Sequence, residues 1–220
     1  MSSGINLRSV ADAPFSADVV SQSTQVLADG TPVTRETHGK MFRDSTGRTR
    51  SETELQSSVA GVVARRFVTI VDPMQRTSIV LDATAKSATV FHLPAAAAVI
   101  ANKVSLAAAT QAGRARIRQL TPPGSDDLGS MMMEGFAVTG TRAGASAASA
   151  AKGGLPTVVT ESWFSKELKV DLLVTRQKPQ SSSQTTKLTN ITPGEPDPNL
   201  FQLPADYTIL DNSQAKGVTQ

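Results

Sequence analysis

The sequence predicts a mainly β protein, a twisted antiparallel sheet with one helical insertion, and three observations support this prediction. Strand-like segments, rich in β-branched or alternating residues, run from Phe15 to Leu93 and resume from Met131 to Ile191. An alanine-rich stretch after Pro94 interrupts them. Residues that favour chain reversal separate the first set of strands: Asp29-Gly30, Ser45-Thr46-Gly47, Asp72-Pro73 and Asp82-Ala83.

The first half of the chain begins with a flexible leader over residues 1–14. Residues 15–27 and 32–43 pair as a hairpin through Asp29-Gly30. In the next strand, residues 48–55, Arg and Glu alternate with Thr and Ser, so neither face is apolar. We therefore expect these first strands to be solvated on their charged face, with Arg paired to Glu across strands.

The apolar strands follow at residues 67–71, 78–81 and 88–93, and we expect them to form the centre of the sheet. Residues 94–130 are then an alanine-rich insertion, in which 95–111 favours a helix. We expect helical structure within 95–120 to lie across the open face of the sheet. The alternative is a mobile surface insertion, because alanine-rich helices of this length are marginal without packing.

The second half of the chain starts with a loop at residues 122–127 and one strand-like segment at 131–142. A low-complexity stretch, residues 143–154, predicts a flexible loop, and strands follow at 157–164, 168–176 and 183–191. Asp197-Pro198 favours a single capped helical turn. We expect four side chains after it to plug an end of the sheet: Leu200, Phe201, Leu203 and Tyr207. One domain over residues 15–210 and a disordered tail over 211–220 complete the prediction.

Composition excludes several classes of function. The 22 Lys and Arg residues are scattered among 19 Asp and Glu residues, and only one Trp, one Tyr and seven Phe occur, which argues against nucleic-acid binding. Cysteine is absent, so thiolate catalysis, thiolate metal sites and disulfides are excluded. No apolar run reaches the roughly 20 residues that span a bilayer.

Catalytic, cofactor and metal motifs are also missing from the sequence. His38 and His92 lie in different predicted strands with no second ligand nearby, and no hydrolase or nucleotide-binding motif occurs. The acids Glu134 and Glu161 flank a hairpin and are expected to be ordinary surface carboxylates. Asp126-Asp127 lacks the spaced oxygen ligands of a calcium loop. We therefore predict no catalytic residues, no metal and no cofactor.

Three consecutive methionines, residues 131–133, are the most suggestive local feature. Alternation along a strand points Met131 and Met133 to one face and Met132 to the other, which splits a thioether metal site. Adaptable apolar lining of a core or lipid cavity is the favoured interpretation. The predicted ligand-lining residues are Val99, Ile100, Val104, Met131, Met133, Phe136 and Trp163.

Several segments together resemble uncharacterised secreted proteins of acidobacteria. They are Asp29 to Arg35, Phe42 to Arg50, Thr160 to Leu168, and Thr189 to Tyr207 with its Asp197-Pro198-Asn199-Leu200-Phe201 core. The resemblance implies export to the periplasm or the exterior, with a targeting peptide replaced here by Met1-Ser2-Ser3-Gly4. More distantly, the order of strands, insertion and closing segment is similar to the LolA, LolB and RseB type of lipoprotein-carrier and sensor folds. That similarity implies a curved, unclosed barrel whose concave face holds acyl chains or a peptide.

Three functions are compatible with these expectations. The first is a non-catalytic exported binding protein, which holds a lipid, lipoprotein or peptide on the concave face of the sheet. The alternative is a structural or assembly subunit of a surface layer or filament, a homo-oligomer that pairs through strand edges. The third is an enzyme that uses dispersed carboxylates and serines.

Overall fold

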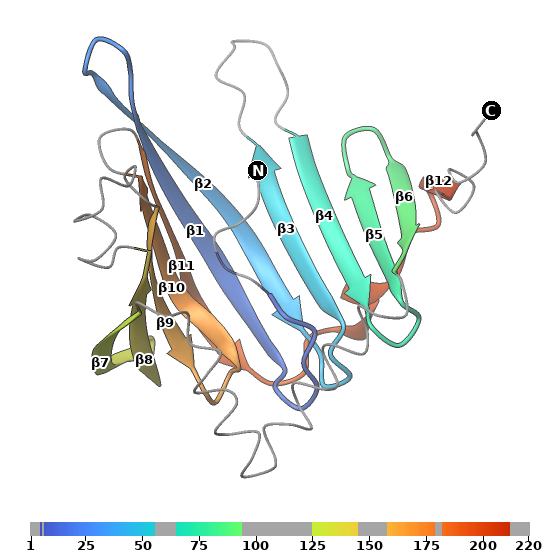
Figure 1. Cartoon of the computed structure of the whole chain (residues 1–220). Helices are drawn as coiled ribbons and strands as arrows, with labels where there is room; N and C mark the ends of the chain where they lie inside the picture. The colour runs from blue at the N-terminus through green and yellow to red at the C-terminus, as the bar shows by residue number, and fades with distance from the viewer. Residues whose placement is uncertain are drawn as a thin grey trace, which may run out of the picture. The chain divides into compact units, whose positions relative to one another are not determined.

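The structure, a computed structural model, describes residues 5, 7–55, 65–93, 125–144, 158–178 and 182–211 (Figure 1). Strands dominate these residues, and the helical turn η1 is the one helical element among them. The elements are β1 (Phe15–Val26), β2 (Pro32–Arg43), β3 (Thr49–Leu55), β4 (Arg65–Asp72), β5 (Thr77–Asp82), β6 (Ser87–His92), β7 (Asp126–Met133), β8 (Phe136–Ala143), β9 (Val159–Ser165), β10 (Val170–Lys178), β11 (Ser182–Pro193), η1 (Pro198–Phe201) and β12 (Thr208–Asp211). The helical cover predicted within residues 95–120, and the loop predicted at 143–154 beyond Gly144, lie outside the described residues.

The twelve strands hydrogen-bond in the order β12-β6-β5-β4-β3-β2-β1-β11-β10-β9-β8-β7, and the sheet is open because β12 and β7 end the order. The strand registers of both units are antiparallel apart from β12, which runs parallel to β6. The predicted antiparallel sheet is confirmed. The prediction that the apolar strands at 67–93 form its centre is wrong, because β1 and β2 hold the middle positions. Instead, the apolar strands β4, β5 and β6 bury one face under η1 and the residues that follow it.

The chain divides into two compact units that are interleaved along the sequence. The first unit consists of Met1–Asn6, Val19–Glu36 and Ala107–Ile191, and the second of Leu7–Asp18, Thr37–Leu106 and Thr192–Gln220. Strands β1, β2 and β11 each contribute residues to both units. No single cut in the chain would therefore separate the units.

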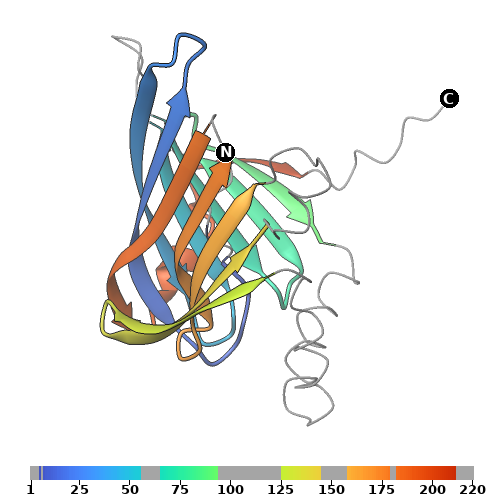
Figure 2. The same cartoon turned by 60° about the vertical axis from the view of Figure 1, so that its left-hand side comes forward.

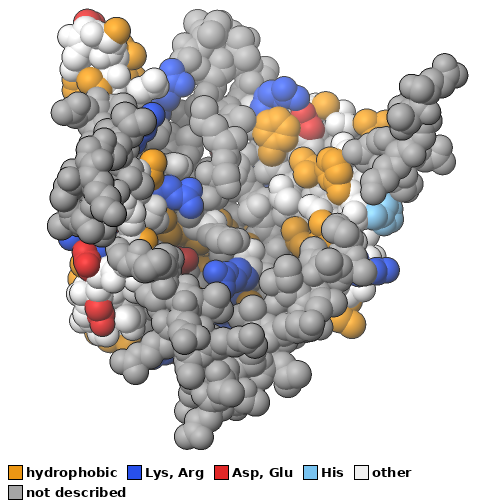
Figure 3. Space-filling model, in the orientation of Figure 1, with side chains coloured by type: hydrophobic (Ala, Val, Ile, Leu, Met, Phe, Trp, Pro, Cys, Tyr) orange, Lys and Arg blue, Asp and Glu red, His pale blue; other side chains and the backbone are white. Residues whose placement is uncertain are grey.

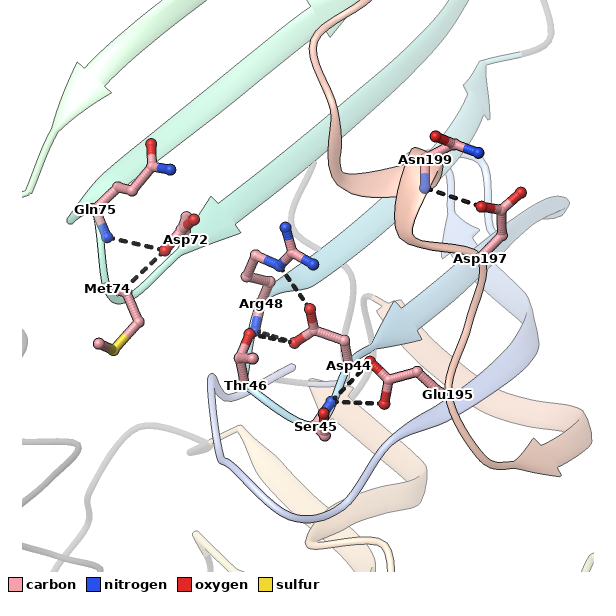
Figure 4. Close-up of polar contacts among 10 residues, drawn as sticks. All are labelled: Asp44, Ser45, Thr46, Arg48, Asp72, Met74, Gln75, Glu195, Asp197 and Asn199. Atoms are coloured by element: carbon pink, nitrogen blue, oxygen red, sulfur yellow. Dashed lines mark hydrogen bonds and ion pairs between the residues drawn. The ribbon is translucent and has the colours of Figure 1, made fainter.

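Aspartate side chains build the turns that the sequence predicted. The Asp72 carboxylate accepts hydrogen bonds from the backbone N–H groups of Met74 and Gln75 at 2.8 and 2.9 Å (Figure 4). Asp82 does the same for the two residues at the equivalent place in the next turn. Because a short carboxylate satisfies the turn's free N–H groups, Asp at the first turn position specifies the reversal locally.

The core of the second unit lies on one face of β4, β5 and β6 and is closed by η1. Buried Val68, Ile70, Leu81 and Ala88 pack with Phe201 of η1. Asp197 caps this turn by accepting the N–H of Asn199 at 2.9 Å, and Pro198 occupies its first position (Figure 4). Leu200, Leu203 and Tyr207 pack against the same cluster, so the four side chains predicted to act together do so, on a face of the strands where the sequence predicted an end of the sheet.

A polar network lies beneath the same segment. The Glu52 carboxylate, only 8% exposed, is paired with Arg50 at 2.7 Å and with Arg66 of the neighbouring strand. Arg50 also donates to the backbone oxygen of Leu200 at 2.7 Å. The expected cross-strand pairing of Arg with Glu is present. The prediction of a solvated charged face is wrong at Arg50 and Glu52, which are only 12% and 8% exposed, because Arg50 lies against Leu200 of η1.

Arg43, at the end of β2, is fully buried in the second unit, where the sequence predicted a polar strand. Its Nε donates to the backbone oxygen of Ala13 at 2.9 Å, and its guanidinium lies 4.9 Å from the centre of the Phe15 ring. Burial lowers the pKa of Arg43 to about 10, so the group is still charged at neutral pH. Its Nη1 also donates to the backbone oxygen of Arg8 at 3.3 Å, so Arg43 contacts two residues of the segment that the sequence assigned to a flexible leader.

The first unit has its own core. Its buried side chains come from β8, β10 and β11: Val138, Val170, Leu172, Val174 and Leu188. A bulge in β10, between Asp171 and Leu173 opposite β9, shifts the register there. Bulges increase the local twist of a strand, so this one helps to coil the unit around its apolar side chains.

Candidate binding face

The β7–β8 hairpin turns through two residues, Glu134 and Gly135, whose φ angles are 52° and 86°. Two positive φ values are typical of a type I′ turn, which matches the twist of a hairpin. The sequence predicted a single strand over residues 131–142, and this prediction is wrong. A continuous strand would point Met131 and Phe136 to opposite faces, but the turn places them on the same one.

Strand pairing fixes that face. Met131 is opposite Val138, and Met133 is opposite Phe136, and directly opposed residues of antiparallel strands point the same way. One strand further, Trp163 of β9 is opposite Gly140 of β8. Since Gly140 and Val138 are two residues apart, Trp163 shares the face of the methionines.

The Trp163 indole packs on Gly140. A Cβ atom at position 140 would lie 2.8 Å from the indole Cη2 and Cζ3 atoms and 2.9 Å from the Cβ of Leu128. The absence of a side chain at Gly140 is therefore what lets the ring lie against the backbone. We use the name β7–β9 apolar face for the six side chains gathered here: Leu128, Met131, Met133, Phe136, Val138 and Trp163.

This face has a covered floor and an exposed rim. Phe136 is 8% exposed and Val138 is buried, whereas Met131 is 46% exposed. Met132, which points to the other side of β7 opposite Ala137, is 68% exposed. In the view of Figure 3, the hydrophobic side chains of the described residues form several separate groups.

An ion pair ties the hairpin to a strand that is not its neighbour. The Glu134 carboxylate accepts a hydrogen bond from Lys187 Nζ of β11 at 2.8 Å, although β9 and β10 separate β8 from β11 in the sheet. The first unit therefore coils until the turn of the β7–β8 hairpin, yellow-green in Figure 2, reaches β11. The Lys187 hydrogen bond lowers the pKa of Glu134, so the carboxylate is charged at neutral pH.

A second ion pair borders the apolar face beyond Trp163. Arg142 and Glu161 are opposed residues of β8 and β9, one step of alternation beyond Gly140 and Trp163, so they lie on the same face. Arg142 Nε donates to Glu161 Oε1 at 2.8 Å. On the opposite face of the same two strands, the hydroxyl groups of Thr141 and Ser162 are 3.1 Å apart.

The structure brings four of the predicted ligand-lining residues together, namely Met131, Met133, Phe136 and Trp163. The other three, Val99, Ile100 and Val104, lie outside the described residues. Sequence reasoning missed Leu128 and Val138. Val138 follows from the hairpin, and the signal for it was Gly135 after a polar residue between Met133 and Phe136. Leu128 is on this face because the register of β7 shifts between Asp127 and Gly129, which the sequence did not signal.

The predicted acidic candidates are engaged in local contacts. Glu134 and Glu161 are each paired with a basic residue, as described above. Asp126 and Asp127 belong to β7 and not to the predicted loop, and the Asp127 carboxylate accepts the N–H of Gly129 at 2.8 Å. Within the part of the chain that the structure describes, no three His, Asp or Glu side chains form a group able to hold a metal ion. In the same part, no helix is long and apolar enough to cross a membrane.

Comparisons with known proteins show a likeness of fold. No family model and no curated protein matches the chain. A solved structure of an uncharacterized conserved protein from Thermus thermophilus is similar with a TM-score of 0.50 and 8% identity, over 90% of each chain. MucB follows with a TM-score of 0.44 and 11% identity, over 92% of this chain and 61% of that one. LprF from Mycobacterium bovis has a TM-score of 0.38 and 14% identity, over 89% and 90%.

At such low identity, the Thermus thermophilus protein shows a shared fold and says nothing about a ligand. The acidobacterial origin stays a prediction.

Proposed function

We propose that the protein is a non-catalytic exported binding protein that holds a lipid, lipoprotein or peptide on the β7–β9 apolar face. The observation that supports this most is the gathering of Met131, Met133, Phe136 and Trp163 on one face by the β7–β8 hairpin. The sequence prediction placed the ligand beneath residues 95–120. The face proposed here is formed by β7, β8 and β9 and does not depend on those residues.

The chemistry of the face suits a flexible apolar ligand. Methionine is unbranched and polarizable, so Met131 and Met133 can adapt to acyl chains of different shapes. Trp163 offers a broad ring beside them, and Phe136 and Val138 form a buried floor. Covering apolar surface contributes roughly 25 cal/mol per Å². An acyl chain laid along the exposed rim at Met131 would gain this stabilisation without rearranging the core.

Native mass spectrometry after mild purification tests the proposal, combined with organic extraction and identification of any bound lipid or peptide. We expect an adduct of the mass of a lipid, lipoprotein fragment or apolar peptide, which disappears after extraction. Protein that is always free of ligand and fails to bind a dansylated fatty acid would contradict the proposal.

A second candidate function is assembly through a strand edge, and β12 is the observation that favours it. This strand ends the sheet, and its Ile209 and Leu210 are 55% and 57% exposed. It has neither Lys nor Pro, the residues that commonly protect an edge. The opposite edge strand, β7, begins with two Asp residues and has an irregular register against β8.

Light scattering coupled to size-exclusion chromatography tests assembly. We expect concentration-dependent oligomers that Leu210→Lys abolishes. A strict monomer over a wide concentration range would remove this candidate and leave the binding proposal unaffected.

A further inference from the structure

The Arg142–Glu161 ion pair is placed where the polar end of a ligand on the β7–β9 apolar face would lie. Trp163 lies one step of alternation from Glu161 on β9, and Gly140 lies one step from Arg142 on β8. Two residues of a strand span roughly 6.6 Å, which is within the reach of a single lipid molecule. A ligand whose chain contacts Trp163 can therefore place its headgroup beside this pair.

The pair keeps hydrogen-bonding capacity. Both contacts between the partners, from Nε and from Nη2 of Arg142, go to the same atom, Glu161 Oε1, and each is 2.8 Å long. Among the described residues, Arg142 Nη1 and Glu161 Oε2 have no other hydrogen-bond partner. The two side chains are 45% and 31% exposed, so a ligand can approach them.

The charges of the pair select among headgroups. A guanidinium binds phosphate oxygens well, and a carboxylate accepts hydrogen bonds only from groups that carry N–H or O–H. An anionic headgroup would be attracted by Arg142 and repelled by Glu161 at nearly the same distance. A quaternary ammonium has no N–H to donate to Glu161. A headgroup with one phosphate and one primary ammonium matches both partners.

We propose that the ligand of the β7–β9 apolar face carries a phosphate and a primary ammonium, as in phosphatidylethanolamine, and that Arg142 and Glu161 bind these two groups. This inference rests on the proposed function. Arg142 Nη1 donates to a phosphate oxygen, and the ammonium donates to Glu161 Oε2. The phosphate, Arg142, Glu161 and the ammonium then form a row of four alternating charges. The bound headgroup adds no net charge to the site.

Quenching of Trp163 fluorescence tests the inference, because Trp163 is the one tryptophan of the chain. The probes are three lysophospholipids with the same dibrominated acyl chain and different headgroups: phosphoethanolamine, phosphocholine and phosphoglycerol. Bromine quenches indole at short range, so quenching reports an acyl chain on the apolar face. We expect the phosphoethanolamine lipid to bind about threefold to fivefold more tightly than the other two, since exposed charge pairs are each worth little.

Two variants test whether Arg142 and Glu161 cause the headgroup preference. Arg142→Gln should bring the three affinities to within about twofold of one another, because it removes the group that holds the phosphate beside Glu161. Glu161→Gln should also remove the preference for the phosphoethanolamine lipid, and the phosphoglycerol lipid should then bind at least as tightly, because Arg142 attracts its anionic headgroup without an opposing carboxylate. Thr141→Ala is the matched control, because Thr141 precedes Arg142 in the same strand and points to the other face. It should keep the preference of the unaltered protein.

The outcomes separate this inference from the proposed function. Equal quenching by all three lipids, or a preference that survives Arg142→Gln and Glu161→Gln, overturns the headgroup assignment and leaves lipid binding intact. Quenching by none of them overturns the headgroup assignment and lipid binding on this face, and leaves only a peptide as the ligand of the proposed function. Preference for the phosphoethanolamine lipid that is lost in both variants and kept in Thr141→Ala supports the inference.

Discussion

Glu134 and Lys187 join the turn of the β7–β8 hairpin to β11 across the width of two intervening strands, with 2.8 Å between the carboxylate oxygen and Nζ. Both side chains are partly exposed, at 26% and 42%. The contact therefore contributes little free energy, although it shows that the first unit coils far enough for the hairpin turn to reach β11. Its strength and its pH dependence can both be measured.

The first prediction concerns this pair. Glu134→Gln and Lys187→Met should each lower the free energy of unfolding by about 0.5 kcal/mol, and the double variant should lose no more than either single one. The pair holds the pKa of Glu134 below its unfolded value, so its contribution is present above about pH 4.3 and is lost as the pH falls through the folded pKa. Urea unfolding followed by Trp163 fluorescence at about pH 7 and pH 3 measures both effects. Additive losses would show that the two groups do not interact, and Lys166→Met, in an exposed turn, is the control.

The second prediction concerns Glu52, whose carboxylate is buried between Arg50 and Arg66 in the second unit. Burial raises the pKa of Glu52, but the hydrogen bonds and charges of the two arginines outweigh it, and the net shift is downward. Glu52→Gln leaves Arg50, only 12% exposed, without its carboxylate partner. We expect a loss of about 2 kcal/mol in the free energy of unfolding at neutral pH.

The sign of the pH dependence follows from the lowered pKa of Glu52. Its contribution is complete above the unfolded value of about 4.3 and disappears as the pH falls through the folded pKa, so the gap between the two proteins should narrow in acid. Urea titrations of both proteins across this range measure the gap. Glu54→Gln, two residues along the same strand and exposed, should change stability by less than about 0.5 kcal/mol. A similar loss in both variants would contradict the assigned role of Glu52.

The third prediction concerns Gly140. Alanine there would place its Cβ 2.8 Å from two atoms of the Trp163 ring and 2.9 Å from Leu128, closer than side chains pack. Gly140→Ala should therefore displace the indole, shift its fluorescence maximum and cost about 1–3 kcal/mol of stability. Thr139→Ala, next to it on the other face of β8, should leave the emission unchanged. An unshifted spectrum in Gly140→Ala would mean that the ring does not rest on this glycine.

The turns and strand positions were predictable because their signals are local. Asp72 and Asp82 each satisfy N–H groups two and three residues away, and Asp197 caps η1 in the same way. Such contacts depend only on a few adjacent residues. The sequence therefore predicted the positions of most strands and of η1 to within a few residues.

Features that depend on distant partners were not predictable from one sequence. The sequence predicts that Arg43 is an exposed strand residue. In the structure it is buried, and it donates a hydrogen bond to the backbone oxygen of Ala13, thirty positions earlier. The four residues of β12 carry no turn signal, and their parallel pairing with β6 depends on a segment far along the chain. The middle position of β1 and β2 likewise results from the pairing of the first strand with β11.

The candidate site contains one feature that a local rule predicts and one that it does not. Alternation correctly separated Met131 and Met133 from Met132, because this rule is local to a strand. The same rule, applied through Glu134 and Gly135 as if the strand continued, would have separated Met131 from Phe136. Only the hairpin turn, with positive φ at both residues, unites them.

The last prediction uses the placement of Met131 and Met132 on opposite faces of β7 to test ligand binding. Met131→Glu places a carboxylate on the β7–β9 apolar face, where a bound chain would have to desolvate it, whereas Met132→Glu places the same charge one residue away on the opposite face. Energy transfer from Trp163 to a dansylated fatty acid measures the affinity. We expect Met131→Glu to weaken binding about tenfold or more and Met132→Glu to stay within about twofold of the unaltered protein. The two variants carry equal net charge on side chains that are both substantially exposed, so general electrostatic repulsion would weaken both alike. Equal losses would therefore place the ligand away from this face, and an effect confined to Met131→Glu would place it on the face.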